Sequence, residues 1–453
     1  MDNLMQMNTY SINRHIIKNN KMKFKIKKIL AYMPLLFIGF VLPQITRAQQ
    51  VLTLERCRQM ALERNNNIKA AMEDINAARA QKAQQDVGGR PSVDGSITGF
   101  YFGKPLNTII PEYGLSSGLG ITQPIYTGGK VRLGKEIAAN GVEIQQEQKV
   151  LVTTEVLFTT ERAYWLVVSA MERIKLALQT KKQLAALYTD LNNHFTAGTT
   201  YKNDVLQAQV QQNANELDIS RAEDNLTMAK LYLAQVTGLT DSTGFTVADF
   251  LDAPINTVID NSPMQKAPTN RSEIKILQTS VSTEELQQKM LAADLRPGVS
   301  LALNGITAFG KSGINPTNKD NFMASYYSML NINIPVFDWG RKRKKIQEQQ
   351  FKVSSQRYQL KEREEQVTLE VQQAFLQLGQ SVKRIGLSDL SLSQAEENLK
   401  LSNDRFKAGT IVGKDVLEAL TIWQQAKSNL LEAKVQYKID AAAYQKATGS
   451  IER

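Results

Sequence analysis

The side chains that most often catalyse reactions or hold metals are scarce in this sequence of 453 residues. It contains one cysteine, Cys57, and two histidines, of which only His194 lies beyond residue 50. A single cysteine excludes an internal disulfide framework and a cysteine-rich zinc site. One histidine gives no basis for a multi-histidine metal site and little for histidine catalysis. We therefore expect a protein without catalytic residues, metal or cofactor.

Three acidic residues stand out because of where they lie along the chain. Asp204 and Asp415 each begin a helical segment shortly after Gly198 and Gly409, and glycine suits a sharp reversal of the chain. Glu418 follows Asp415 by three residues, so the two carboxylates share a helix face. A carboxylate in the first turn of a helix interacts favourably with the helix dipole, by about 0.3–1 kcal/mol. The helix dipole alone therefore gives these carboxylates a purely structural role.

The segments that carry these acids occur twice in the chain. A shift of 211 residues superimposes 124–238 on 335–449, and a shift of 206 aligns the segments upstream. The shift of 211 pairs Pro124 with Pro335, Phe195 with Phe406, Asp204-Val205-Leu206 with Asp415-Val416-Leu417, and Thr237-Gly238 with Thr448-Gly449. One register kept over this length indicates an internal duplication. The predicted parts are a first repeat at 49–238, a linker at 239–270, a second repeat at 271–449 and a tail at 450–453.

Each repeat is predicted to contain a helix, two strands, a long helix, a turn and a second long helix. Leu54 to about Asp86 has helical spacing without proline or glycine. The segment from about Lys130 to Phe195 would form about 100 Å of helix. Apolar residues recur there at every seventh position, which is typical of supercoiled helices. The rows are Val150, Leu157, Tyr164, Met171, Leu178 and Ala185, and then Val371, Leu378, Ile385, Leu392, Leu399 and Phe406. A simple fibrous coiled coil would explain these rows but not the strands.

The predicted strands alternate apolar residues with small or polar ones. Tyr113, Leu115, Leu119 and Ile121 alternate with glycine, serine and threonine, and Leu330, Ile332 and Ile334 alternate with asparagine. Their partner strands begin just after Arg90-Pro91 and Arg296-Pro297. Such alternation over about ten residues suits strands between lipid and a wet lumen; half-buried strands of a soluble sheet are the alternative. Four strands cannot close a useful barrel, and an open edge is too costly in lipid, so several chains must combine their strands.

The first 48 residues have the pattern of a secretory signal peptide. A basic run at 22–28 precedes the apolar stretch from Ile29 to Leu42 and a possible cleavage site at Thr46-Arg47-Ala48, with Met22 as the expected start. The alternative, an uncleaved anchor, would need roughly 20 apolar residues. Without 1–48 the chain has 47 lysines and arginines against 43 acids, a net charge of +4 instead of +11. The charge therefore gives no argument for binding nucleic acid.

Short motifs recur in a fixed order through both repeats. They are Leu52-Thr53-Leu54-Glu55, Arg90-Pro91, Gln123-Pro124-Ile125-Tyr126, Phe195-x-Ala197-Gly198 before Asp204, and Val236-Thr237-Gly238, with Ile334-Pro335-Val336-Phe337, Arg405-Phe406-x-Ala408-Gly409 and Asp415-Val416-Leu417 in the second repeat. Their order and spacing over about 51–449 resemble the TolC family of outer membrane efflux proteins. The resemblance implies a mainly α-helical fold with a membrane β-barrel. In a homotrimer, twelve strands would form the barrel in the outer membrane, and the tandem-duplicated coiled-coil helices would form a tunnel across the periplasm.

The resemblance also implies a passive exit duct and no enzyme. The duct would serve a periplasmic adaptor protein and an inner-membrane transporter, with small molecules favoured over secreted proteins as cargo and with outer membrane lipids around the barrel. The adaptor would contact the helix tips at Ala197, Gly198, Thr199, Ala408, Gly409 and Thr410. Asp415 and Glu418 would form acidic rings at the narrow pore entrance, together with Asp204, and such rings favour cations. A non-conducting periplasmic coiled-coil scaffold is the alternative from another class.

Two further features bear on the tip and on the membrane boundary. Phe406 and Ile411 stand where the family's best-known pattern has a tyrosine and an arginine that lock the closed tip, so closure is expected to rest on other contacts. Aromatic residues, among them Phe337 and Trp339, lie near strand ends, where an aromatic girdle would be. The basic run at 341–345 could meet anionic headgroups or could be an ordinary solvated patch.

Overall fold

The computed structural model describes residues 50–240, 244–248, 251, 271–311, 314–315 and 320–451. These residues belong to one compact unit, Gln49–Arg453. The predicted signal peptide at 1–48 and most of the predicted linker at 239–270 lie outside the described residues. Within the described part, the helices include none that combines the length and the apolar character needed to cross a membrane.

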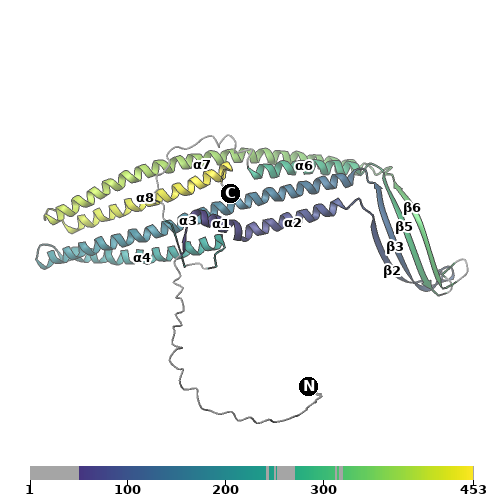
Figure 1. Cartoon of the computed structure of the whole chain (residues 1–453). Helices are drawn as coiled ribbons and strands as arrows, with labels where there is room; N and C mark the ends of the chain where they lie inside the picture. Colours follow the sequence, from purple (N-terminus) through teal and green to yellow (C-terminus); the bar gives the residue numbers. More distant parts are fainter. Residues whose placement is uncertain are drawn as a thin grey trace, which may run out of the picture. The chain divides into compact units, whose positions relative to one another are not determined.

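The helices and strands of the second repeat follow the order of the first. The first repeat contains α1 (Leu54–Arg64), α2 (Asn66–Asp86), β2 (Ser92–Tyr101), a short 3-10 helix η1 (Leu106–Thr108), β3 (Tyr113–Tyr126), α3 (Lys130–Thr196) and α4 (Lys202–Thr237). The second contains α6 (Ser272–Ala293), β5 (Gly298–Gly310), β6 (Phe322–Asn333), α7 (Arg341–Lys407) and α8 (Gly413–Thr448). Within this unit, the helix pairs α3–α4 and α7–α8 have their connecting turns at the end away from the sheet (Figure 1). The sequence did not predict the short parallel pair of β1 (Gln50–Leu52) and β4 (Phe245–Val247).

The predicted heptad rows behave differently in α3 and α7, which have 67 residues each. In α7 the row remains in the interface with α8, and its buried members are Val371, Leu378, Leu399 and Phe406. In α3 the row leaves the core: Leu178 is 44% exposed, and Leu184 and Leu191 are buried instead. A straight α-helix drifts by about 20° per heptad. The buried stripe of α3 therefore moves to neighbouring positions along the helix.

The prediction of one helix from Leu54 to about Asp86 is wrong in one respect, because the helix is interrupted at Asn65. Asn65 is extended, with φ −62° and ψ 128°. Its Nδ2 donates to the carbonyl oxygen of Val236 at 2.8 Å, and its Oδ1 accepts from the backbone N–H of Asn67 at 2.9 Å. One asparagine thus caps α2 and joins the break to the end of α4.

The four long strands form one antiparallel sheet in the order β2-β3-β5-β6. The register aligns Leu115 with Phe309 and Phe309 with Phe322, and it aligns Ile121 with Leu303. These residues share one face of the sheet, because side chains alternate between faces along a strand. The other face carries mainly glycine, serine, threonine and asparagine, with Asp94 as the only charged residue of these four strands. The register therefore confirms the predicted alternation for Tyr113–Ile121 and for Leu330 and Ile332, whereas the other face also carries some large side chains, among them Ile306 and Tyr327.

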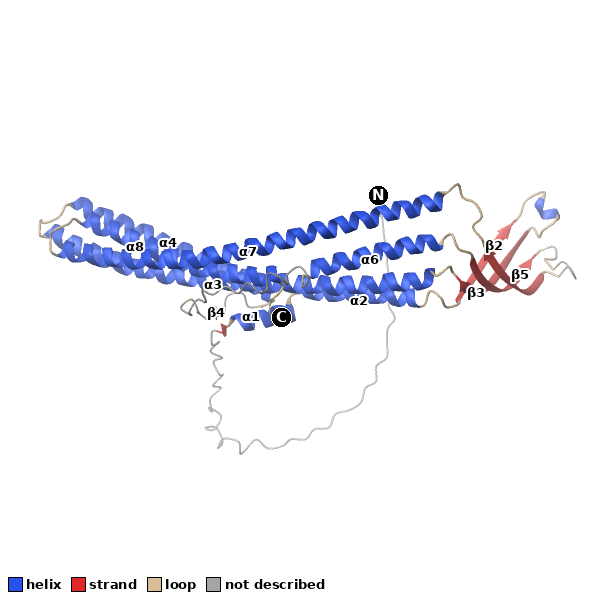
Figure 2. Ribbon diagram, turned by 90° about the horizontal axis from the view of Figure 1, so that it is seen from above, coloured by secondary structure: helices blue, strands red, loops and turns tan. Residues whose placement is uncertain are grey.

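The helices next to the sheet follow the order of its strands. α2 packs against α3, α3 against α6, and α6 against α7 (Figure 2). This row matches the strand order β2-β3-β5-β6. Each strand is thus joined to a helix in the same relative position, and α2 and α7 lie at the two ends of the row.

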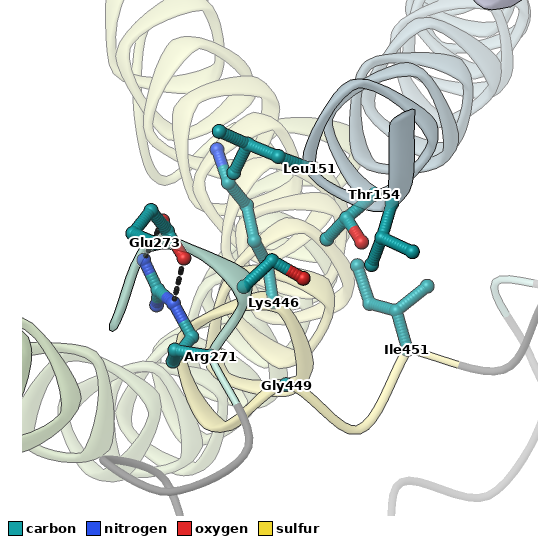
Figure 3. A pocket seen from close by; sticks show the side chains of 9 residues that line it. Leu151, Thr154, Arg271, Glu273, Lys446, Gly449 and Ile451 are labelled. Carbon is teal, nitrogen blue, oxygen red and sulfur yellow. Dashed lines mark hydrogen bonds and ion pairs between the residues drawn. The ribbon is translucent and has the colours of Figure 1, made fainter. Parts of the chain in front are cut away.

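A charged network joins α6, α7 and α8 where the second repeat begins. The guanidinium of Arg271 donates to Glu273 at 2.6 Å, to Glu370 at 3.1 Å and to the carbonyl oxygen of Ala447 at 2.9 Å. Arg271 and Glu273 line a small pocket with residues of α3 and α8, among them Lys446 (Figure 3). Burial opposes the charge on Glu273, but the hydrogen bond and the charge of Arg271 outweigh it, so the pKa of Glu273 lies below its ordinary value.

We expect Arg271→Ala to lower the free energy of unfolding by about 1.5–3 kcal/mol, because it removes the charge-assisted hydrogen bonds of Arg271 and leaves Glu273 and Glu370 paired with Arg363 alone among the described residues. The lowered pKa of Glu273 means that its stabilising effect is present above the ordinary value of 4.5 and is lost as the pH falls through the folded value. Thermal unfolding of the detergent-solubilised protein between pH 7 and pH 3 (roughly the range over which carboxylates titrate) measures both effects. The control is Lys352→Ala, which removes an exposed pair with Glu348 and should cost at most about 1 kcal/mol. Equal losses in the two variants would contradict the prediction.

Candidate functional site

The two helix pairs end in turns of the same geometry. Gly198 and Gly409 have φ values of 73° and 70°, the left-handed conformation in which helices often end and which glycine adopts without strain. The backbone N–H of Thr199 donates to the carbonyl oxygen of His194 at 2.9 Å, and the backbone N–H of Thr410 donates to the carbonyl oxygen of Arg405 at 3.0 Å. The predicted tip residues all lie in these turns and all are exposed: Ala197, Gly198, Thr199, Ala408, Gly409 and Thr410.

The three predicted acids have different surroundings at this tip. Asp415 and Glu418 are exposed on one face of α8, and Asp415 also accepts a hydrogen bond from the backbone N–H of Val412 at 3.3 Å. Asp204 is 9% exposed and accepts a hydrogen bond from the hydroxyl of Thr200 at 2.7 Å. The structure therefore brings Asp415 and Glu418 together on a solvent-facing surface and holds Asp204 within the chain. Among the described residues, histidine, cysteine, aspartate and glutamate form no group of three or more that could hold a metal ion.

An apolar cluster, which the sequence did not predict, joins the two helix pairs just behind the turns. Its buried members are Leu187, Leu191, Val205, Ala208, Phe406 and Val416. The ring of Phe406 meets His194 edge to face, with centroids 5.3 Å apart, and Ile411 packs against the same cluster. Phe406 and Ile411, for which the sequence suggested an altered closure, thus contribute to a contact between the helix pairs of one chain.

The helix pairs approach each other closely at Gly413, the first residue of α8. Gly413 is buried, Leu191 of α3 is fully buried, and a Cβ atom at Gly413 would overlap Leu191 Cδ2. The shift of 211 residues pairs Gly413 with Lys202, which is exposed, and pairs Leu191 with Ser402. The two repeats therefore differ where they meet, since a leucine of one fills the space that a glycine of the other leaves. This departure from the repeat is the sequence signal that could have revealed the contact.

We expect Gly413→Ala to destabilise the protein by about 1–3 kcal/mol through overpacking, and Leu191→Ala to do so by about 2–5 kcal/mol through the cavity that it leaves. The double variant should be more stable than the sum of the two losses predicts, because the new methyl group enters the space that the leucine vacates. Thermal unfolding and limited proteolysis at the tip measure these effects. Lys202→Ala, at the exposed repeat position, is the control and should change little. Strict additivity would show that the two positions do not share this space.

Both repeats of the chain are similar to known proteins. A family model described as "Outer membrane efflux protein" matches residues 57–239 and 264–450. The solved structure of CusC has a TM-score of 0.75 and 16% identity, covering 87% of this chain and 92% of that chain. The structure of a membrane protein from Pseudomonas aeruginosa has a TM-score of 0.76 and 19% identity, covering 87% of this chain and 92% of that chain. The CmeC outer membrane channel of Campylobacter jejuni has a TM-score of 0.72 and 18% identity, covering 88% of this chain and 87% of that chain. No curated protein matches this sequence.

Proposed function

The chain belongs to the outer membrane efflux protein family, as its motifs indicated, and we propose that three copies of it form a continuous duct through the outer membrane and the periplasm. The family consists of outer membrane channels and not of enzymes. The proposal covers the assembly of this chain, the proteins that it binds and the position at which its pore is narrow.

The observation that carries the proposal is the open four-stranded sheet. Its outer strands, β2 and β6, have no second partner in the described part of the chain, and one of its faces is apolar. Unpaired strand edges cannot face lipid, because each unsatisfied backbone group costs several kcal/mol there. Three copies would supply twelve strands, a number within the range of known outer-membrane barrels. The row from α2 to α7 would close in the same way and form the helical tunnel.

The exposed turns support docking to a periplasmic adaptor. The six tip residues, from Ala197 to Thr199 and from Ala408 to Thr410, are exposed at the end of the helices away from the sheet. An adaptor bound there would connect the duct to an inner-membrane transporter, which would supply the energy and choose the cargo. We favour small molecules as cargo.

The acids of α8 support a cation-selective entrance at the same tip. In a trimer, Asp415 and Glu418 of three chains would form two rings of carboxylates, and such rings attract cations and bind multivalent ones. Asp204 would join them only if the helix pairs rearranged, because its carboxylate is buried within the single chain.

Conductance of the purified trimer in planar bilayers tests the proposal. We expect small cation-selective channels that multivalent cations block, and we expect Asp415→Asn with Glu418→Gln to weaken the block by at least about tenfold, a loss of about 1.4 kcal/mol of blocker binding. Glu223→Gln with Asp224→Asn changes the charge equally on the exposed face of α4 and should leave the block intact. An absence of channels would overturn the duct, whereas conducting channels with an unchanged block would overturn only the placement of the rings. Asp204→Asn should leave the block unchanged.

A further inference from the structure

The turn before α7 has a tryptophan where its counterpart before α3 has a glycine. The turn before α3 contains two left-handed glycines, Gly128 with φ 67° and Gly129 with φ 96°. The turn before α7 contains Trp339 with φ 59° and Gly340 with φ 81°, and Trp339 is the only non-glycine residue with positive φ among the described residues. A bulky side chain is disfavoured in this conformation. Since glycine fills the matching position, the turn itself does not require a tryptophan.

Hydrogen bonds to Asp338 fix the backbone of this turn and hold the tryptophan outward. The carboxylate of Asp338 accepts hydrogen bonds from the backbone N–H groups of Gly340 and Lys342, both at 3.0 Å. Trp339 is 90% exposed, and its ring packs against Phe337 with centroids 5.0 Å apart. Phe337 is itself 75% exposed. The chain therefore presents an aromatic pair to its surroundings on a hydrogen-bonded turn.

This aromatic pair follows directly along the chain from residues of the sheet's apolar face. Leu330 and Ile332 lie on that face of β6, and Ile334 and Val336 continue the alternation beyond the strand; all four are exposed. In the proposed barrel this face contacts lipid. The pair then lies where the lipid-facing strand gives way to a polar helix, which is the level of the bilayer that tryptophan prefers.

Positive charges follow the aromatic pair directly. Arg341, Arg343 and Lys345 are exposed at the start of α7, and none forms an ion pair within the described part of the chain. Lys342 instead donates to the carbonyl oxygen of Asp294 at 3.0 Å and joins α7 to the end of α6. Exposed aromatic rings beside exposed cations match a bilayer surface that carries anionic headgroups.

We propose that residues 336–345, the interfacial segment, anchor the chain to the membrane leaflet next to the helices. Phe337 and Trp339 enter the interface, and Arg341, Arg343 and Lys345 bind anionic phospholipid headgroups. This inference rests on the proposed barrel, because only a membrane at the level of the sheet brings lipid to the segment. A neighbouring copy of the chain is the competing occupant of the aromatic pair.

Quenching of tryptophan fluorescence distinguishes these occupants. The sequence has three tryptophans, and Trp165 and Trp423 are 4% and 3% exposed within the helices. The difference in emission between the wild type and Trp339→Phe therefore isolates Trp339. In vesicles containing the full-length trimer and brominated phospholipids, bromine near the headgroups should quench Trp339 more strongly than bromine at the bilayer centre. The emission that remains in Trp339→Phe should be insensitive to bromine. A conducting trimer whose Trp339 is not quenched would overturn the anchor and leave the duct standing.

The charge of the lipid tests the headgroup site. At equal bromine content, brominated phosphatidylglycerol should quench Trp339 about two- to threefold more strongly than brominated phosphatidylcholine, because cations attract anionic lipid. Combined Arg341→Gln, Arg343→Gln and Lys345→Gln should remove this preference, as should high salt.

The matched control removes three exposed charges from the distant part of α7, with Lys383→Gln, Lys400→Gln and Lys407→Gln, and should keep the preference. Equal quenching of the wild type by both lipids would overturn the headgroup site. If the wild type showed neither quenching of Trp339 nor conductance, the result would instead count against the duct itself.

Discussion

The unpaired edges of the four-stranded sheet are the constraint on which the rest of the structure depends. Backbone N–H and C=O groups cannot remain unpaired in hydrocarbon, so β2 and β6 require partners from other chains. The helices keep the order of the strands to which they are joined. Closure of the sheet would therefore bring α7 of one copy beside α2 of the next, so barrel and tunnel would close through the same rotation.

Departures from the internal repeat show where the two halves of the chain have become specialised. Some matching positions keep the same role, as in the turns at Gly198 and Gly409, which have nearly equal φ values. Gly413 and its partner Lys202 differ because only one of them receives a leucine from the other repeat. Trp339 and Gly128 differ because one is exposed, whereas a Cβ on the other would lie 2.9 Å from the carbonyl oxygen of Ala293. In both pairs the difference follows from what each position contacts.

Periodic features of this fold could be predicted from the sequence, and single contacts could not. The helix expected from about Lys130 to Phe195 ends at Thr196, because an uninterrupted pattern and a glycine define its limits. The strand alternation is confirmed because one face differs in polarity from the other. At the break, Asn65 combines a local cap on Asn67 with a hydrogen bond to Val236, 171 residues away. The burial of Asp204 depends on how α4 packs. No local pattern encodes the contact with Val236 or the packing of α4.

The contacts within one chain and those expected between chains at the tip differ in kind. Within the chain, Leu191 packs on Gly413 and Phe406 on His194, and neither contact is a pair of opposite charges that salt would screen. Between copies, the exposed carboxylates of Asp415 and Glu418 would repel one another, by about 1 kcal/mol for a pair 4 Å apart in water. Separating the copies would relieve that repulsion, whereas separating the helix pairs of one chain would expose the apolar cluster. We therefore expect each chain's two helix pairs to move as one body, and any two-state shift that the proposed adaptor would bias to lie between subunits.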